Sequence, residues 1–462
     1  FGYRIFEPNV RCYIQSSRVN EAIRDSLSSS KGIANFRYLN NGVTIFYESI
    51  NKRRQNLGEL SFRKPGVVNG LQTIKTLSEV YKNLDQARKD EFDNNCYVQV
   101  RAFKSDAGIP VDDIIIATNN QNKMKPRNLE SNTETQKFYE QAFANKGWFY
   151  ERKDGSWQAF CENSGDWPGL IGKRPSHFGS NQKKNRRVLS NEDVAVAWLS
   201  FSGYSDIARS EKTKIFENEQ LRRRCFELVP ALHGFDYSFE RRGPLKDPAS
   251  LEEPLDSGTL LLASLCLLTL RNILPTKKET DTKFIQKYKL DGQTVEEQQS
   301  ELLKQPDYIA QLMMVSAPYT FVELMGYLFL KTVVKGQYAQ HSELILNSPG
   351  MVDVYNKKDF SVIKKTIDDE SVGEEDLFAS VYFLWKNIWE ELASSGIWRT
   401  NLLAASSRPS HAHIRENRLK IIERVIEMDD QIKIRPLTTN WSRMFDKNSS
   451  IINVIRRGLK KP

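Results

Sequence analysis

Asparagine and glycine residues gather at the ends of apolar runs in three places along this chain. The first two clusters read YLNNGVTIFY (residues 38–47) and VVNGLQTIKTL (residues 67–77), and the third reads TNNQNKMK (residues 118–125). Buried carboxamides are costly unless each donor and acceptor finds a partner. Their position beside core segments therefore indicates either a closed internal network or a site for a ligand.

The cluster around Asn69 predicts a strand, a tight turn and a helix. Residues 66–68 are apolar, Asn69 and Gly70 both tolerate positive φ, and apolar residues recur at helical spacing from residue 71. Such a turn aims backbone N–H groups and the positive end of the helix dipole at one point, which suits an anion or the polar edge of a base. Gln72 and Thr73 would add side-chain donors. The alternative is a plain tight turn with Gln72 in solvent.

The other two clusters are expected to complete the same site. Asn40 and Asn41 precede a β-rich run, which also fits an ordinary hairpin turn. The third cluster contains Asn119, Asn120, Gln121 and Asn122. Asparagine reads adenine through two hydrogen bonds, and glutamine can do the same. We expect the three loops to converge on one cleft.

The charge of the chain favours a polyanionic partner. Its net charge is +9 and its isoelectric point about 9.1. The alternative is a basic soluble protein that has no polyanionic partner. The strongest basic patch, residues 173–187, is predicted to be a loop that either contacts phosphates or links two domains. The cations expected to contact nucleic acid are Arg11, Arg152, Lys153, Lys183, Lys184, Arg186 and Arg187.

Catalytic and metal signatures are weak. Residues 151–153 (ERK) match the acidic–lysine end of a metal-dependent nuclease site, but the second carboxylate that would hold Mg²⁺ is not evident. Arg408 and His413 have a spacing used by helical ribonucleases, yet Pro409 interrupts the helix. Five cysteines without a CxxC pair predict a reduced, cytoplasmic protein with no zinc. No cofactor is therefore expected.

The pattern predicts a mixed α/β N-terminal domain followed by a mostly α-helical C-terminal domain. We place an α/β core at residues 1–165, a basic loop with a helical extension at 166–242, and a helical domain with a basic tail at 243–462. The most apolar run, residues 259–270, is shorter than a membrane span and predicts a buried helix. No membrane role is expected.

Five motifs, in this order along residues 1–191, resemble the AIPR family, named for abortive infection and phage resistance in bacteria. They are PNVRCYI, FRYLNNGVTI, VVNGLQTIKTL, IIIATNNQNKMKPRNLESNTETQ and GWFYERKDG. Two departures are Ile14-Gln15, where the family pattern has Leu-Gly, and the more basic residues 123–125. The VNGLQT turn is also similar, more loosely, to the DGQHR-type turn of ParB-like proteins.

The resemblance implies a bacterial phage-defence protein in the cytoplasm. It further implies a restriction-type nuclease segment upstream of Phe1, and Mg²⁺ is expected only with that segment. The expected role of this chain is nucleic-acid recognition, with DNA favoured, and its further partners would be defence-system proteins or a second copy. Two alternatives stay open: an enzyme that processes nucleotides or modified bases, and a non-catalytic scaffold.

Overall fold

A computed structural model describes the chain over thirteen stretches. They are residues 5–9, 18–52, 60–105, 126–162, 170, 172–179, 186–210, 214–226, 228–229, 253–332, 338–371, 376–394 and 424. The chain divides into two compact units, Phe1–Asn191 (unit 1) and Glu192–Pro462 (unit 2). The domain limits predicted near residues 165 and 242 stay predictions.

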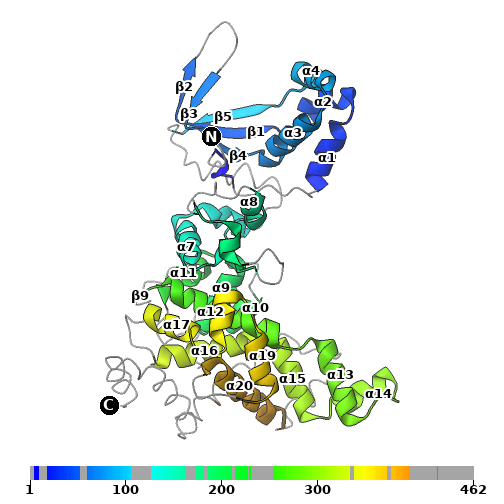
Figure 1. Cartoon of the computed structure of the whole chain (residues 1–462), viewed down its shortest axis with the longest axis vertical. Coiled ribbons are helices and arrows are strands. Elements are labelled where there is room, and N and C mark those ends of the chain that lie inside the picture. Colours follow the sequence, from blue (N-terminus) through cyan, green and yellow to red (C-terminus); the bar gives the residue numbers. More distant parts are fainter. Residues whose placement is uncertain are drawn as a thin grey trace. The chain divides into compact units, whose positions relative to one another are not determined.

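The first part of unit 1 contains a small mixed sheet (Figure 1). Strand β1 (Val43–Tyr47) lies in the middle, antiparallel to β4 (Gly66–Asn69) and parallel to β5 (Val100–Lys104). Strands β2 (Ser49–Lys52) and β3 (Leu60–Arg63) form a separate antiparallel pair. The helices of this part are α1 (Arg18–Ser26), α2 (Ser30–Leu39), α3 (Leu71–Asn83) and α4 (Gln86–Asn95).

These helices form for reasons visible in the sequence. The Ser29 side chain caps α2 by accepting a hydrogen bond from the Gly32 N–H at 3.1 Å, and Asp85 caps α4 through the Arg88 N–H. Ile33 and Phe36 on α2 are buried with apolar residues of α1, and Leu77 packs against them from α3. One apolar core cluster of unit 1 therefore lies among these helices.

The second part of unit 1 has an aromatic core. Its elements are α6 (Pro126–Leu129), η3 (Glu130–Asn132), α7 (Glu134–Asn145), β6 (Phe149–Glu151), α8 (Ser156–Glu162), η4 (Pro175–Phe178) and β7 (Val188–Ser190). Strands β6 and β7 pair in parallel. Phe149, Trp157, Phe160 and Phe178 pack together with ring centroids 5.1–6.1 Å apart. The Thr133 side chain caps α7 by accepting a hydrogen bond from the Gln136 N–H.

Unit 2 is almost entirely helical in the part that the structure describes. Its elements are α9 (Asn191–Phe201), α10 (Ser205–Ser210), α11 (Glu219–Phe226), β8 (Leu228–Val229), β9 (Glu253–Pro254), α12 (Ser257–Ile273), α13 (Lys277–Tyr288), α14 (Val295–Leu302), α15 (Pro306–Ser316), α16 (Pro318–Thr332), α17 (Tyr338–Leu346), α18 (Met351–Lys357), α19 (Ser361–Asp368) and α20 (Leu377–Ser394). The fold class predicted from the sequence, mixed α/β and then helical, is confirmed.

Helix α12 carries the most apolar run of the chain, and its side chains are buried on nearly every side, as predicted. It packs against α16 and α17, while α15 packs against α20. No single helix among the described residues is long and apolar enough to cross a membrane. Two bent pairs, α12 with α13 and α15 with residues 318–330 of α16, reach that length and composition only together.

Asp376 provides a pH-dependent test of unit 2. Its Oδ1 accepts a hydrogen bond from the Ala379 N–H at 3.0 Å at the start of α20, but burial raises the pKa of its carboxyl and outweighs that bond. A carboxyl whose pKa is higher in the folded than in the unfolded state stabilises the fold most in acid, and this contribution is lost as the pH rises through the folded pKa. We therefore expect Asp376→Asn to be at least as stable as the parent at pH 7.

Urea unfolding midpoints at pH 7 and pH 4.5 measure this effect, and the advantage of Asp376→Asn should shrink at the lower pH. Asp359 is the control of opposite sign, because hydrogen bonds from Ser361 lower the pKa of its carboxyl. Asp359→Asn should lose stability at pH 7. A clear loss of stability in Asp376→Asn at pH 7 would show that its charged form is favourable.

Candidate nucleic-acid interface

Two of the three asparagine clusters meet at one corner of the sheet. We call Asn40, Asn41, Gly42, Asn69, Gly70, Gln72 and Thr73 the asparagine corner. The Asn40 Oδ1 accepts hydrogen bonds from the Gly42 N–H at 2.8 Å and from the Thr73 hydroxyl at 3.2 Å. The Thr73 bond joins the turn before β1 to the first turn of α3. These two loops are therefore in contact, and the cleft that the three loops were expected to line stays a prediction.

Glycine is required where the two turns touch. Gly70 has φ +99° and precedes α3, and a Cβ there would lie 2.9 Å from the Gly42 carbonyl oxygen and from the Val43 Cα. A Cβ on Gly42, with φ +76°, would lie 2.3 Å from the Gln99 carbonyl oxygen. The segment just before β5, which contains Gln99, therefore packs against the turn at Gly42. The strand, glycine turn and helix predicted from residue 66 onward are confirmed, and the helix α3 ends at Asn83.

The corner is partly closed and partly open. Thr73 is buried, Asn40 and Asn69 are half-buried, and the Asn69 Oδ1 accepts from the Gly70 N–H at 2.8 Å. Asn41 is exposed, and Gln72 is half-buried in the first turn of α3. The alternative of a hairpin turn at Asn40 is wrong, because this residue ends α2 and the chain continues directly into β1.

Exposed aromatic side chains lie beside the corner. Tyr38, two residues before Asn40, is 72% exposed, and Tyr97, two residues before Gln99, is 55% exposed. The Arg37 guanidinium carbon lies 4.7 Å from the centroid of the Tyr38 ring and 5.8 Å from that of the Tyr97 ring. We call Arg37, Tyr38 and Tyr97 the aromatic border. No salt bridge of Arg37 is found within the described part of the chain.

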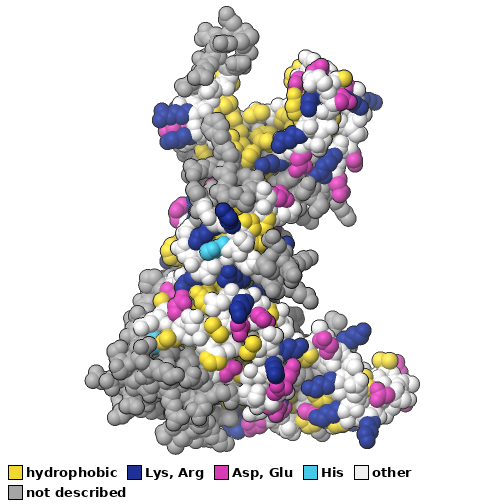
Figure 2. Space-filling model, viewed as in Figure 1, with side chains coloured by type: hydrophobic (Ala, Val, Ile, Leu, Met, Phe, Trp, Pro, Cys, Tyr) yellow, Lys and Arg dark blue, Asp and Glu magenta, His cyan; other side chains and the backbone are white. Residues whose placement is uncertain are grey.

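The aromatic border continues onto an exposed sheet. Every residue of β5 is exposed, including Val100 and Phe103, and Arg101 and Lys104 add two cations to the same strand. Figure 2 shows hydrophobic side chains gathered over this sheet and the neighbouring helices. None of these residues was predicted as a site residue, although an aromatic residue next to an Asn-Gly cluster is a signal that could have identified Tyr38.

Arg152 and Lys153 lie in a different environment from the one expected. Arg152 is fully buried and binds the Glu140 carboxylate at 2.9 Å, the Ser131 carbonyl oxygen at 2.8 Å and the Glu7 carboxylate. The Lys153 ammonium donates to the main-chain oxygens of Glu7 and Asn9 at 2.6 and 2.9 Å. We call these side chains and their partners the Arg152 hub.

The carboxylates around Arg152 determine the direction in which its pKa is shifted. Burial lowers the pKa of Arg152, but the charges and hydrogen bonds of Glu140 and Glu7 more than offset this effect, so the net pKa is raised. Both cations are occupied by protein groups and are inaccessible to a phosphate in this arrangement. Their expected contact with nucleic acid stays a prediction, and the protein oxygens that already bind both cations argue against it.

The remaining candidates fall into two groups. Arg186 lies over the Trp157 ring, with its guanidinium carbon 5.8 Å from the ring centroid, and Arg187 donates to the His177 carbonyl oxygen at 2.6 Å. The other candidates lie outside the described residues and stay predictions: Arg11, Asn119, Asn120, Gln121, Asn122, Lys183 and Lys184. Arg408 and His413 also lie outside them.

No group of three or more histidine, cysteine, aspartate or glutamate side chains that could hold a metal ion occurs among the residues that the structure describes. The four cysteines described, Cys96, Cys161, Cys225 and Cys266, are free thiols. Burial raises the pKa of Cys96 to about 11. The chemistry offered by the corner and its border is therefore hydrogen bonding, stacking and cationic attraction.

A family model described as AIPR protein matches residues 6–236, which is half of the 462-residue chain. The chain therefore belongs to the AIPR family, as its five motifs predicted. Membership supports a role in phage defence and abortive infection. No curated protein and no solved structure matches the chain.

Proposed function

We propose that this chain is the nucleic-acid-recognising portion of a phage-defence effector, and that it binds nucleic acid at the asparagine corner and the aromatic border. The observation that carries the proposal is their adjacency. Carboxamides that can read base edges lie next to two exposed tyrosine rings and an arginine without a salt bridge in the described part of the chain. The reaction of the effector, expected to be that of a nuclease, is a further proposal.

The geometry favours nucleic acid with accessible bases. Proteins that bind single strands combine a basic surface with aromatic rings on which bases stack. Tyr38 and Tyr97 supply exposed rings, and Arg37 supplies a guanidinium plane beside both. Asn41 is exposed one residue after Asn40 and three residues after Tyr38. Paired bases in a duplex would leave the rings without a stacking partner.

Tyr38→Ala is the first test of the border. Stacking of one base on an aromatic side chain contributes about 1–3 kcal/mol, so we expect the variant to bind single-stranded DNA or RNA about tenfold more weakly. Fluorescence anisotropy with labelled single strands and duplex, measured from low to moderate salt, gives the affinities. Phe138→Ala is the matched control, because Phe138 is 58% exposed on α7, away from the corner in sequence and element.

Two outcomes of that measurement would contradict the proposal. Equal loss in Tyr38→Ala and Phe138→Ala would remove the border from the interface. Absence of binding by the parent protein at low salt would remove nucleic-acid recognition from this chain altogether, since phosphate attraction is strongest there.

Asn41→Asp tests the corner independently of stacking. The change replaces an amide by a carboxylate of nearly equal size, and its negative charge repels phosphates and cannot donate to a base. We expect several-fold weaker binding, with little change in the urea unfolding midpoint. Asn83→Asp is the control, because Asn83 is exposed at the far end of α3. Similar affinities in the two variants would place the corner outside the interface.

A further inference from the structure

Strand β5 lies at the edge of the three-stranded sheet, and only one of its two sides is paired with β1. The Val43 N–H donates to the Gln99 carbonyl oxygen at 2.8 Å, just before β5. Because the ladder between β1 and β5 is parallel, alternate residues of β5 bond β1, and the residues between them face the other way. Val100 and Ala102 are two of the residues that face away from β1. Within the described part of the chain, their main-chain N–H and C=O groups have no partner.

This edge is also exposed and apolar. Every residue of β5 is exposed. Seven of the ten large apolar side chains that are exposed among the described residues lie between residues 38 and 103, in the first part of unit 1. They include Val100 and Phe103 of β5 and Ile50 and Leu60 of the β2–β3 pair. An exposed apolar edge strand pairs readily with another strand, and a gathering of exposed apolar side chains marks a protein interaction site.

The surroundings of β5 have room for a single strand. In Figure 1, β5 runs between the β2–β3 pair and the helices α2 and α4, and both groups extend beyond it on the same side. Figure 2 shows hydrophobic side chains on the floor of the hollow between them. A second copy of the chain has its own β5 at the bottom of the same kind of hollow, so two such edges cannot approach each other. An extended peptide fits where a second copy does not.

The charge around β5 selects the kind of peptide. Arg101 and Lys104 on β5 are exposed, and no salt bridge of Arg101 is found within the described stretches. Next to β5, Arg63 and Lys64 both pair with the Glu48 carboxylate, at 3.3 and 3.4 Å, so one negative charge serves two cations. The local excess of positive charge favours a partner with acidic side chains.

We propose that β5 binds an extended acidic segment of a partner protein, which joins the sheet as a fourth strand. The main-chain groups of Val100 and Ala102 bond those of the peptide, and its acidic side chains face Arg101. In this mode of recognition main-chain hydrogen bonds give affinity and side chains give specificity. Aliphatic side chains such as Ile50 and Leu60 give a base no ring to stack on, which favours a peptide over a nucleic-acid strand at this edge.

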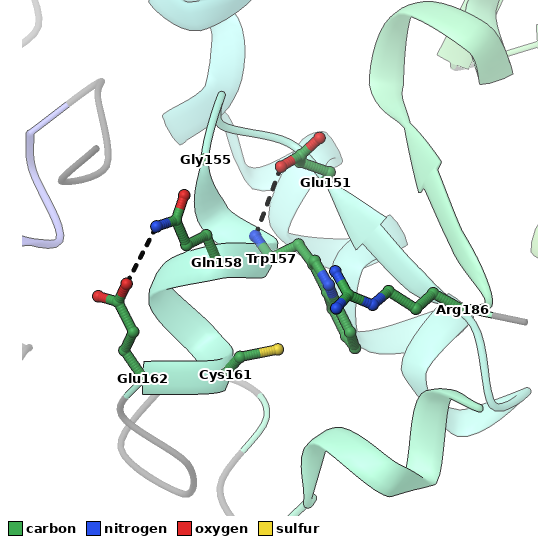
Figure 3. A pocket seen from close by; sticks show the side chains of 7 residues that line it. All are labelled: Glu151, Gly155, Trp157, Gln158, Cys161, Glu162 and Arg186. Atoms are coloured by element: carbon green, nitrogen blue, oxygen red, sulfur yellow. Dashed lines mark hydrogen bonds between the residues drawn. The ribbon is translucent and has the colours of Figure 1, made fainter. Parts of the chain in front are cut away.

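The cavity beside α8 offers a different surface (Figure 3). It has a volume of about 470 Å³, and its main wall is a helix, which presents side chains rather than an open strand edge. On this wall the Gln158 amide donates to the Glu162 carboxylate at 3.1 Å. An acidic peptide would meet two carboxylates there, those of Glu151 and Glu162, and would be repelled. Gln158 therefore serves as a control position.

Fluorescence anisotropy of the full chain with a labelled peptide of alternating glutamate and valine tests the proposal. Because main-chain pairing tolerates many sequences, this peptide should bind, and a peptide of alternating lysine and valine should bind more weakly at low salt. The glutamate peptide with all its main-chain nitrogens methylated should not bind, since it has no N–H to donate. No binding of the glutamate peptide at millimolar concentration, or equal binding of its methylated form, would overturn the proposal.

Ala102→Pro removes the N–H that faces the peptide. This N–H points away from β1, and proline is tolerated on edge strands in that position, so the urea unfolding midpoint should stay close to that of the parent. We expect about tenfold weaker binding of the glutamate peptide, because one of its acceptors loses its donor. Ala102→Val keeps the N–H and is the matched control, and Gln158→Ala is the control for the α8 cavity. Parental affinity in Ala102→Pro, or an equal loss in Gln158→Ala, would overturn the proposal.

This inference is independent of the proposed function. Ala102→Pro should bind labelled single strands as tightly as the parent, because Ala102 belongs to neither the asparagine corner nor the aromatic border. Equal losses of single-strand and peptide binding would instead assign the β5 edge to the nucleic-acid interface. Sedimentation velocity should give the same mass for the parent and for Ala102→Pro. A dimer of the parent that is lost in Ala102→Pro would identify a second copy as the occupant and overturn the peptide proposal.

Discussion

Replacement of Arg152 by methionine is expected to lower the free energy of unfolding by about 3–5 kcal/mol, the cost of removing one partner from a buried ion pair. The loss arises because Glu140, itself only 3% exposed, would keep a buried carboxylate without its guanidinium. The Ser131 carbonyl oxygen would also lose its donor at 2.8 Å. Urea unfolding followed by tryptophan fluorescence measures the change.

Lys137→Met on α7 is the control for the Arg152 hub. Lys137 pairs with Glu134 at 2.9 Å, but both side chains are exposed, and such a pair contributes less than about 1 kcal/mol. The double variant Arg152→Met/Glu140→Gln should recover part of the loss, because no buried carboxylate is left unpaired. If Arg152→Met unfolds at the same urea concentration as Lys137→Met, the Arg152 hub does not stabilise the fold.

Arg152→Lys should not restore the parent stability. The guanidinium bonds Glu140 through Nε and Ser131 and Asn132 through Nη1, and an ammonium group on a flexible stem cannot reproduce this fixed fork. We expect an unfolding midpoint between those of the parent and Arg152→Met. The comparison separates the effect of geometry from that of charge.

Gly326→Ala is the second change with a large expected effect. Gly326 lies on α16, and a Cβ there would be 1.7 Å from the Phe201 carbonyl oxygen and 2.6 Å from its carbon at the end of α9. Because the obstacle is backbone, the two helices must move apart. We expect a loss at or above the upper end of the about 1–3 kcal/mol that overpacking costs, despite the better helix propensity of alanine.

The control for this steric clash is Gly292→Ala. No heavy atom lies within 4 Å of a Cβ at Gly292, and its φ is not positive, so alanine should be neutral or stabilise by up to about 1 kcal/mol. Urea unfolding of both variants gives the comparison. Equal midpoints for Gly326→Ala and Gly292→Ala would mean that α9 and α16 are not in close contact in solution.

The sequence predicted those elements whose signals are local. The run at residues 259–270 was predicted as a buried helix, and the segment from residue 66 onward as strand, glycine turn and helix; both are found. In both cases the deciding signal spans only a few residues: an unbroken apolar run, or a glycine with positive φ. Short local motifs likewise identified the family.

The sequence by itself determined the fold class, the family and the residue types of the asparagine corner. Only the tertiary structure decided that Arg152 is buried, because Glu7 lies 145 residues from it and the charge of a side chain does not reveal which carboxylates will reach it. Tertiary contacts likewise left Tyr38 exposed beside Asn40 and brought Arg186 over Trp157. Whether a charged or aromatic side chain becomes core or surface depends on distant segments, since burial is favourable only when the whole set of partners is assembled.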